Sequence, residues 1–185
     1  MSLIAHYPLT GNIDDYSGNG NHGLNYGATT NSSGKIGSCY HFGTGYNRVE
    51  LPLGNLKDML NFSIAFWCKV DTTASNTVDE RIITVRRASG STAWSVTYAR
   101  PSTYVSQLEF YYYNGSTVVT KTLSSFLKNQ WQHIALVVQN NKLYYFIDGV
   151  DMSSQTNDIQ ISPVDTYGNV VIGNFGSELS RPLGG

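Results

Sequence analysis

Oxygen-bearing side chains are concentrated in a short glycine-rich stretch near the start of the chain. DDYSGNGNHG begins at residue 14. Calcium takes about six to eight oxygen ligands from carboxylates, side-chain amides and backbone carbonyls. The glycines would let backbone carbonyls turn toward an ion. The stretch therefore predicts a calcium site whose ligands are Asp14, Asp15, Asn19 and Asn21, with Ser17 between them.

The same stretch has a second interpretation, as a series of tight turns. Asn and Asp side chains form hydrogen bonds with nearby backbone groups and favour turns. Two carboxylates are few for tight calcium binding, and the spacing does not match an EF-hand. His22 would then fix the loop through hydrogen bonds instead of acting as a catalytic base. Calcium ligation and turn formation both remain open at this point.

A second group of residues has chemistry suited to sugars. Sugars present C–H faces that stack on Tyr and Trp, while their hydroxyls form hydrogen bonds with Asn, Asp and Arg. Small-ligand sites combine such apolar walls with a few polar groups. The alternative is a purely structural role, because Tyr is a good strand former and aromatic pairs stabilise sheets. The candidate ligand-binding residues are Trp94, Tyr98, Arg100, Tyr111, Tyr113 and Asn114.

The carboxylates do not form a catalytic pattern. Glycoside hydrolases place two carboxyl groups about 5 to 9.5 Å apart across one cleft. Asp79 and Glu80 are adjacent, so on a strand they would face opposite sides. Glu50, Glu109 and Glu178 are isolated, and no Gly-x-Ser-x-Gly nucleophile motif is present. The sequence therefore predicts binding without catalysis.

Alternating apolar and polar residues predict the strands that must hold these groups. In NFSIAFWCKV, the side chains of Phe62, Ile64, Phe66 and Cys68 share one face. A period of two residues indicates a strand with one buried face. AWSVTYA, residues 93–99, has the same pattern, so a second strand is predicted there.

The stretch QLEFYYYNGSTVVTKTL predicts a hairpin. Its Asn114-Gly115 pair suits a two-residue type I′ turn, in which both residues need positive φ. In the strand before this turn, Leu108, Phe110 and Tyr112 share one face. Tyr111 and Tyr113 are therefore predicted on the opposite, non-core face.

A second hairpin is predicted around Asn140-Asn141, because Asn tolerates positive φ better than most residues. WQHIALVV precedes this turn and KLYYFIDGV follows it. A last short strand is predicted over 169–173, and the only helix over 53–61. Many short strands separated by turn signals are typical of an all-β sandwich.

Length and composition narrow the class of protein. A chain of 185 residues suits one domain. Its net charge of −1 argues against a nucleic-acid partner. No apolar run approaches the roughly 18 residues that would span a bilayer. The N-terminus has no positively charged segment followed by a long apolar one, so no signal peptide is predicted.

Five segments, in order, resemble LamG-like jelly-roll domains of the concanavalin A-like lectin/glucanase superfamily. The segments are LIAHYPLTGNIDDYSGNGNHG, GKIGSCYHFGTGYNRVEL, FSIAFWCKV, WQHIALVVQNNKLYYFIDG and VVIGN. The resemblance covers nearly the whole chain. It implies one domain over 1–185, an all-β jelly-roll sandwich of two antiparallel sheets. Some relatives of this kind hold calcium near their loops.

One departure from the family pattern concerns the last strand. Members usually continue beyond the VVIGN segment into a strand with an Asp-x-x-Arg-x-Tyr-like pattern, which pairs with the N-terminal region. Here ELSRPLGG follows instead. We therefore expect either a fragment of a longer chain, or an open sheet edge near LIAHYPL that a neighbouring protein subunit fills.

The resemblance and the aromatic residues together predict a non-catalytic, lectin-like module. It would bind a glycan or cell-surface polysaccharide as part of a phage virion or a bacterial surface protein. We therefore expect a virion or extracellular location. The alternative is a structural or assembly domain of such a particle or protein, which packs against other subunits without binding sugar.

Overall fold

A computed structural model gives the architecture, and the described residues contain strands and no helix. The structure describes residues 2–43, 47–53, 60–70, 80–87, 92–102, 105–125, 129–153, 157–162 and 167–173. The predicted helix at 53–61 falls mainly on residues 54–59, outside the described residues. No described helix has the length and apolar character needed to cross a membrane.

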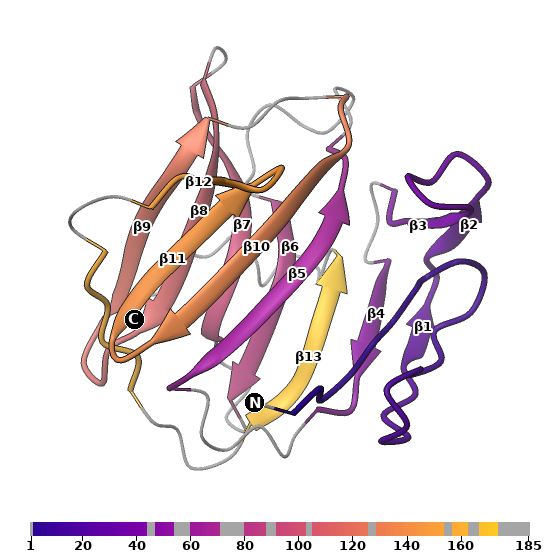
Figure 1. Ribbon diagram of the computed structural model, residues 1–185, viewed down its shortest axis with the longest axis horizontal. Coiled ribbons are helices and arrows are strands. Elements are labelled where there is room, and N and C mark those ends of the chain that lie inside the picture. Colours follow the sequence, from indigo (N-terminus) through magenta and orange to yellow (C-terminus); the bar gives the residue numbers. More distant parts are fainter. Residues whose placement is uncertain are drawn as a thin grey trace.

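Two antiparallel sheets face each other (Figure 1). The large sheet has seven strands in the order β1 (Leu24–Tyr26), β4 (Arg48–Leu51), β13 (Tyr167–Gly173), β6 (Glu80–Arg87), β7 (Thr92–Ser102), β8 (Val105–Tyr113) and β9 (Val118–Ser125). The small sheet has four strands in the order β12 (Val150–Asp151), β11 (Lys142–Ile147), β10 (Gln132–Gln139) and β5 (Phe62–Cys68). A separate hairpin pairs β2 (Thr29–Asn31) with β3 (Cys39–His41). The predicted jelly-roll sandwich is confirmed.

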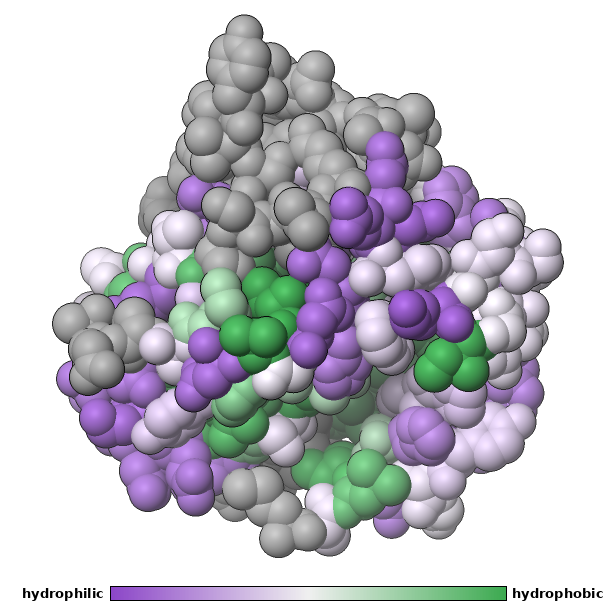
Figure 2. Space-filling model, turned by 45° about the horizontal axis from the view of Figure 1, so that its top comes forward, coloured by the Kyte–Doolittle hydropathy of each residue, from purple (hydrophilic) through white to green (hydrophobic). Residues whose placement is uncertain are grey.

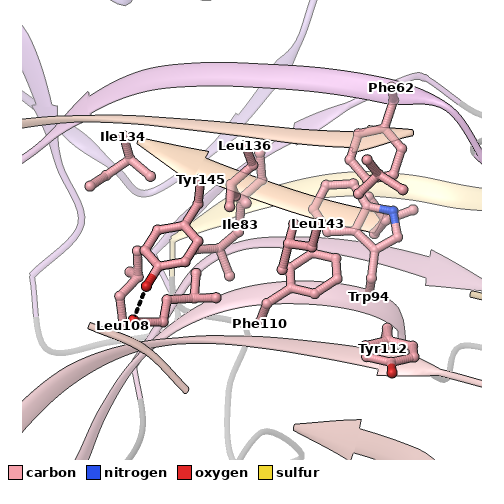
Figure 3. Close-up of a cluster of buried hydrophobic side chains, with 14 of the residues drawn as sticks. Phe62, Ile83, Trp94, Leu108, Phe110, Tyr112, Ile134, Leu136, Leu143 and Tyr145 are labelled. Carbon is pink, nitrogen blue, oxygen red and sulfur yellow. Dashed lines mark hydrogen bonds between the residues drawn. The ribbon is translucent and has the colours of Figure 1, made fainter. Parts of the chain in front are cut away.

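The core lies between the two sheets and follows the predicted alternation. On β10, Ile134, Leu136 and Val138 are buried, because every second side chain of this strand points toward the large sheet. Figure 3 shows side chains from both sheets meeting in this layer. The ring of Phe62, from β5, stacks on that of Trp94, from β7, at a centroid distance of 4.9 Å. The sheets are thus joined by direct aromatic packing.

The two predicted hairpin turns have different outcomes. Asn140 and Asn141 have φ of 52° and 59°, and Gln139 pairs with Lys142, so the two-residue turn is confirmed. The two-residue turn predicted at Asn114-Gly115 is wrong. Tyr113 pairs with Val118, which leaves a loop over 114–117.

The side chain of Asn114 explains the longer loop. Its Oδ1 accepts hydrogen bonds from the backbone N–H groups of Ser116, at 3.0 Å, and Thr117, at 2.8 Å. Gly115 has a positive φ of 100°, while Asn114 does not have a positive φ. Asn side chains compete with backbone pairing in this way, so the Asn-Gly signal leads to a wider turn here.

The predicted open edge near LIAHYPL concerns the N-terminal segment and the residues after β13. Within the described part of the chain, β5 pairs only with β10. Residues 3–9 form no strand. Residues 174–185, which follow β13, lie outside the described residues. The filling of this edge by another subunit therefore stays a prediction.

Candidate functional site

The large sheet separates the predicted ligand-binding residues onto two faces. Trp94 and Tyr98 share the inward face of β7 with Val96, and their exposed fractions are 1% and 0%. Their burial removes both from the candidate ligand surface. Trp94 and Tyr98 lie near Tyr111 and Tyr113 in the sequence, but the alternation of β7 directs their side chains into the core.

Tyr111 and Tyr113 lie on the outer face of the large sheet, as predicted. Two further polar residues of β8, at alternating positions, share this face. The Tyr111 hydroxyl donates a hydrogen bond to one carboxylate oxygen of Glu109, and Gln107 donates to the other. We call Gln107, Glu109 and Tyr111 the β8 row. The row holds a carboxylate in one orientation on the outer face.

Two small hydroxyl residues of β7 lie beside the β8 row. Thr97 pairs with Glu109, and Ser95 pairs with Tyr111. Both point away from the core, yet their exposed fractions are only 1% and 0%. Their hydroxyl oxygens are 3.4 Å apart. The outer face is therefore a packed layer of polar side chains rather than a bare sheet surface.

Arg81 lies across this layer. Its backbone pairs with Thr97, which places it on the outer face of β6. Its Nη1 donates a 2.7 Å hydrogen bond to the Thr92 hydroxyl. Since Thr92 begins β7 and Thr97 lies farther along the strand, the Arg81 side chain runs along the face past Ser95.

Glu50 brings a second carboxylate to the same face, on β4. It accepts hydrogen bonds from Arg48 Nε at 2.7 Å and from Asn169 Nδ2 at 3.0 Å. Burial opposes ionisation, but these two hydrogen bonds and the positive charges of Arg48 and Arg86 lower the pKa of Glu50 overall. Glu50 is therefore an anion held between arginines.

Of the remaining predicted ligand residues, Tyr113 and Asn114 lie at and just after the end of β8. The side chain of Arg100, on β7, is outside the described residues. The Arg87 guanidinium lies 4.3 Å from the ring centroid of Tyr113. The Tyr113 hydroxyl donates to the Gly115 carbonyl at 2.7 Å. The carboxamide oxygen of Asn114 already accepts two hydrogen bonds within the loop over 114–117.

The two carboxylates of this face are not arranged for glycoside hydrolysis. Glu50 lies on β4 and Glu109 on β8, and the sheet order puts β13, β6 and β7 between them. With neighbouring strands about 4.8 Å apart, the two backbones are separated by roughly 19 Å. A hydrolase pair needs a separation of about 5 to 9.5 Å.

The predicted calcium ligands meet in a loop built around Asp15. Its carboxylate accepts hydrogen bonds from the backbone N–H groups of His6 (2.9 Å), Ser17 (2.9 Å) and Asn21 (3.0 Å), and from the Ser17 hydroxyl (2.8 Å). Burial opposes ionisation of Asp15, but these bonds outweigh it and hold its pKa well below the usual range.

The two asparagines among the predicted ligands direct amide donors, not oxygens, toward their partners. The amide nitrogen of Asn19 donates to the Leu3 and Ile4 carbonyls at 2.9 Å each, and that of Asn21 donates to Ile4 at 3.1 Å. His22 Nδ1 accepts the N–H of Asp15 at 3.3 Å and lies 3.5 Å from an Asp14 oxygen. The described residues contain no cluster of three acidic, His or Cys side chains suited to a metal. This arrangement does not fit calcium, because N–H and O–H donors already surround Asp15.

Calcium addition is expected to leave the thermal midpoint unchanged, because a bound ion would have to displace the donors to Asp15. A real site would add about 2.7 kcal/mol of stability at a calcium concentration 100-fold above its Kd. Differential scanning fluorimetry with calcium and then with EDTA checks this. An increase in midpoint that EDTA reverses would restore the calcium site.

Sequence reasoning missed most of the outer face. The alternation that placed Tyr111 there also places Gln107 and Glu109, so the β8 row could have been found from sequence. Arg81 and Arg86 come from β6 and Glu50 from β4, and neither strand is paired with β8. Only the strand order and register bring them to this face.

Comparisons with known proteins agree with the fold. No curated protein matches the chain. Domain 4 of AbnA, a GH43 extracellular arabinanase from Geobacillus stearothermophilus solved with arabinotriose, is 16% identical with a TM-score of 0.59. That match covers 97% of this chain and 98% of that domain. The alginate lyase AlyC3 in complex with dimannuronate is 14% identical with a TM-score of 0.50, over 70% of this chain and 64% of the lyase.

At these identities the two structures establish the fold alone. The family assignment comes from sequence. The family model Laminin_G_3, described as concanavalin A-like lectin/glucanases superfamily, matches residues 42–185. This match covers most of the chain and includes every strand of both main sheets except β1. The chain therefore belongs to this family of the concanavalin A-like lectin/glucanase superfamily.

Proposed function

We propose that this protein is a non-catalytic carbohydrate-binding module that binds a glycan on the outer face of the large sheet. The observation that carries the proposal is the β8 row, where Gln107 and Tyr111 fix the carboxylate of Glu109 on that face. Glu109 itself is 7% exposed, so its role is to orient Gln107 and Tyr111, whose half-buried side chains would meet the hydroxyls and the C–H face of a sugar.

The neighbouring residues supply the remaining contacts. Tyr111 is half-buried, so part of its ring can pack against a sugar. Arg81 and Gln107 carry N–H groups that would donate hydrogen bonds to the ring and hydroxyl oxygens of the sugar. Ser95 and Thr97 are buried beside the β8 row, and such close packing restricts the motion of neighbouring side chains. Rigid polar groups bind with a smaller loss of side-chain entropy.

The separation of Glu50 from Glu109 supports binding without hydrolysis. The resemblance to a domain of an extracellular enzyme, solved with arabinotriose, is compatible with a role in holding a polysaccharide. We propose an extracellular setting, as part of a phage virion or a bacterial surface protein, with a cell-surface polysaccharide as the target.

Tyr111→Ala is expected to weaken glycan binding by about tenfold or more, equivalent to about 1.4 kcal/mol, because it removes both the ring and a bond to Glu109. The measurement is a glycan-array screen followed by calorimetry on the best ligand. Tyr144→Ala is the matched control, since Tyr144 is a half-buried tyrosine on the outer face of the small sheet.

Equal losses in the two tyrosine variants would place the glycan elsewhere. A folded protein that binds no glycan on the array would overturn the proposal. Thermal melts of both variants show whether a loss of binding reflects a loss of folding.

A second candidate function is assembly with a neighbouring protein subunit, and the outer face of the small sheet favours it. Trp67 is 38% exposed, and its ring lies 4.7 Å from Lys35 Nζ and 5.2 Å from the His133 ring. Figure 2 shows hydrophobic residues (green) near the middle of one side of the molecule. Apolar and aromatic residues of this outer face are Ala65, Trp67, Ala135, Val137, Tyr144 and Phe146.

Assembly and glycan binding therefore predict opposite roles for the two faces. If assembly is the function, light scattering will show an oligomer that Tyr144→Ala disrupts and Tyr111→Ala does not. A stable interface usually buries at least about 1,000 Å² in total. A monomer at all concentrations would remove this candidate.

A further inference from the structure

We propose that the glycan bound on the outer face of the large sheet is acidic, a polymer with carboxylate or sulfate groups. This inference rests on the proposed function and specifies its ligand class. The feature that carries it is a group of three arginines, Arg81, Arg86 and Arg87, which we call the arginine cluster. All three belong to β6.

The cluster forms because one side chain reaches along the sheet toward the others. Arg81 begins near the far end of β6, but its guanidinium donates to the Thr92 hydroxyl. Thr92 pairs with Arg86 in the β6–β7 register. The guanidinium of Arg81 therefore approaches the end of β6 that carries Arg86 and Arg87, five and six residues farther along the strand.

Bringing like charges together is unfavourable unless an anion balances them. Glu50, on β4, attracts Arg86 electrostatically, and its carboxylate already accepts a hydrogen bond from Arg48. The described side chains of the outer face and its end thus place Arg48, Arg81, Arg86 and Arg87 against Glu50 and Glu109, four positive against two negative charges. These six described side chains carry a net positive charge, while the whole chain has a net charge of −1.

The cations of this region are arginines, which distinguishes it from the rest of the described surface. Three described lysines lie elsewhere, Lys35 over Trp67, Lys69 over Trp131 and Lys142 beside Asp158, and the fourth, Lys121, is on the edge strand β9 opposite the inward-facing Phe110. A guanidinium has a planar fork of N–H groups that matches the oxygens of a carboxylate or sulfate. A lysine ammonium is a point charge without that geometry.

Tyr113 joins the cluster to the β8 row. Its ring lies under the Arg87 guanidinium at 4.3 Å, and it is two residues from Tyr111 on the same face of β8. Stacking uses the flat face of a guanidinium and leaves its N–H edge directed outward. A sugar packed on Tyr111 would thus have its acidic group near arginines that are already held in place.

The test titrates the full chain with polysaccharides of known charge. Polygalacturonate supplies carboxylates, dextran sulfate supplies sulfates, and unmodified dextran and arabinan are neutral. We expect at least tenfold tighter binding to one of the acidic polymers than to either neutral polymer, and weaker binding as salt rises. The two acidic arms decide which anion is recognised.

Arg81→Gln and Arg86→Gln are expected to weaken binding of the acidic polymer at least tenfold each, while their thermal midpoints stay close to that of the parent. Arg81→Lys keeps the charge but loses the fork, so it should also bind more weakly. Lys142→Gln is the matched control, because it removes one positive charge from the other sheet.

Equal weakening by Lys142→Gln and the arginine variants would indicate non-specific attraction and overturn the inference. Binding of neutral glycans as tight as that of acidic ones would also overturn it, while the proposed function would stand. Absence of binding to all four polymers would overturn the inference, and the glycan-array screen would then decide whether the proposed function stands.

Discussion

Replacing Trp94 with alanine is expected to lower the free energy of unfolding by about 3 to 5 kcal/mol, the usual cost of removing a large buried aromatic. Trp94 is 1% exposed and packs between the two sheets. Its ring stacks on Phe62 of the small sheet at 4.9 Å and lies 5.8 Å from Phe110 of the large sheet (Figure 3). Alanine would leave a cavity across this junction. Equilibrium unfolding in guanidinium chloride measures the change.

Trp94→Phe provides the control, because it keeps an aromatic ring and removes the indole N–H. Within the described part of the chain, that buried N–H has no hydrogen-bond partner. Deleting an unpartnered polar group recovers part of its desolvation cost. We therefore expect the phenylalanine variant to lose much less stability than the alanine variant. A loss below about 1 kcal/mol in Trp94→Ala would contradict core packing and return Trp94 to the candidate ligand surface.

The core could be predicted from sequence because its determinants are local. In β5 and β10, apolar side chains recur at every second position, and the buried faces follow that period. The same rule fails to separate ligand residues from core residues in β7. There Trp94 and Tyr98 point inward, but Ser95 and Thr97 on the other face are just as buried. Burial of the second face depends on parts of the chain outside β7, which local alternation cannot show.

The two hairpin turns also show that local sequence signals do not determine every feature of the fold. Asn140-Asn141 and Asn114-Gly115 have similar local signals, and only the first forms a two-residue turn. The difference lies in the Asn114 side chain, whose oxygen accepts two backbone N–H groups. The arginine cluster is still less accessible to sequence, since it needs the register of Arg86 against Thr92 and the direction of the Arg81 side chain.

Replacing Asp15 with asparagine is expected to detach the N-terminal segment from the loop that follows it. The Asp15 carboxylate joins His6 to Ser17 and Asn21 through four hydrogen bonds. An amide has one oxygen in place of two, and its NH₂ group would face N–H donors. Hydrogen exchange should then accelerate at the amides of these three residues. Asp14→Asn is the matched control, because the Asp14 side chain is exposed and one of its oxygens lies 3.5 Å from His22 Nδ1.

The stabilising effect of Asp15 should also depend on pH in a defined direction. Its pKa in the folded protein is lowered, although burial opposes this, because the four hydrogen bonds favour the carboxylate. The unfolded chain binds a proton near the ordinary pKa of about 3.9. The stabilisation is therefore complete above that pH and is lost as the pH falls toward the folded-state pKa. Thermal midpoints of the parent and Asp15→Asn should differ most at neutral pH and converge in acid. A constant difference between pH 7 and the acid range would show that the Asp15 charge does not stabilise the loop.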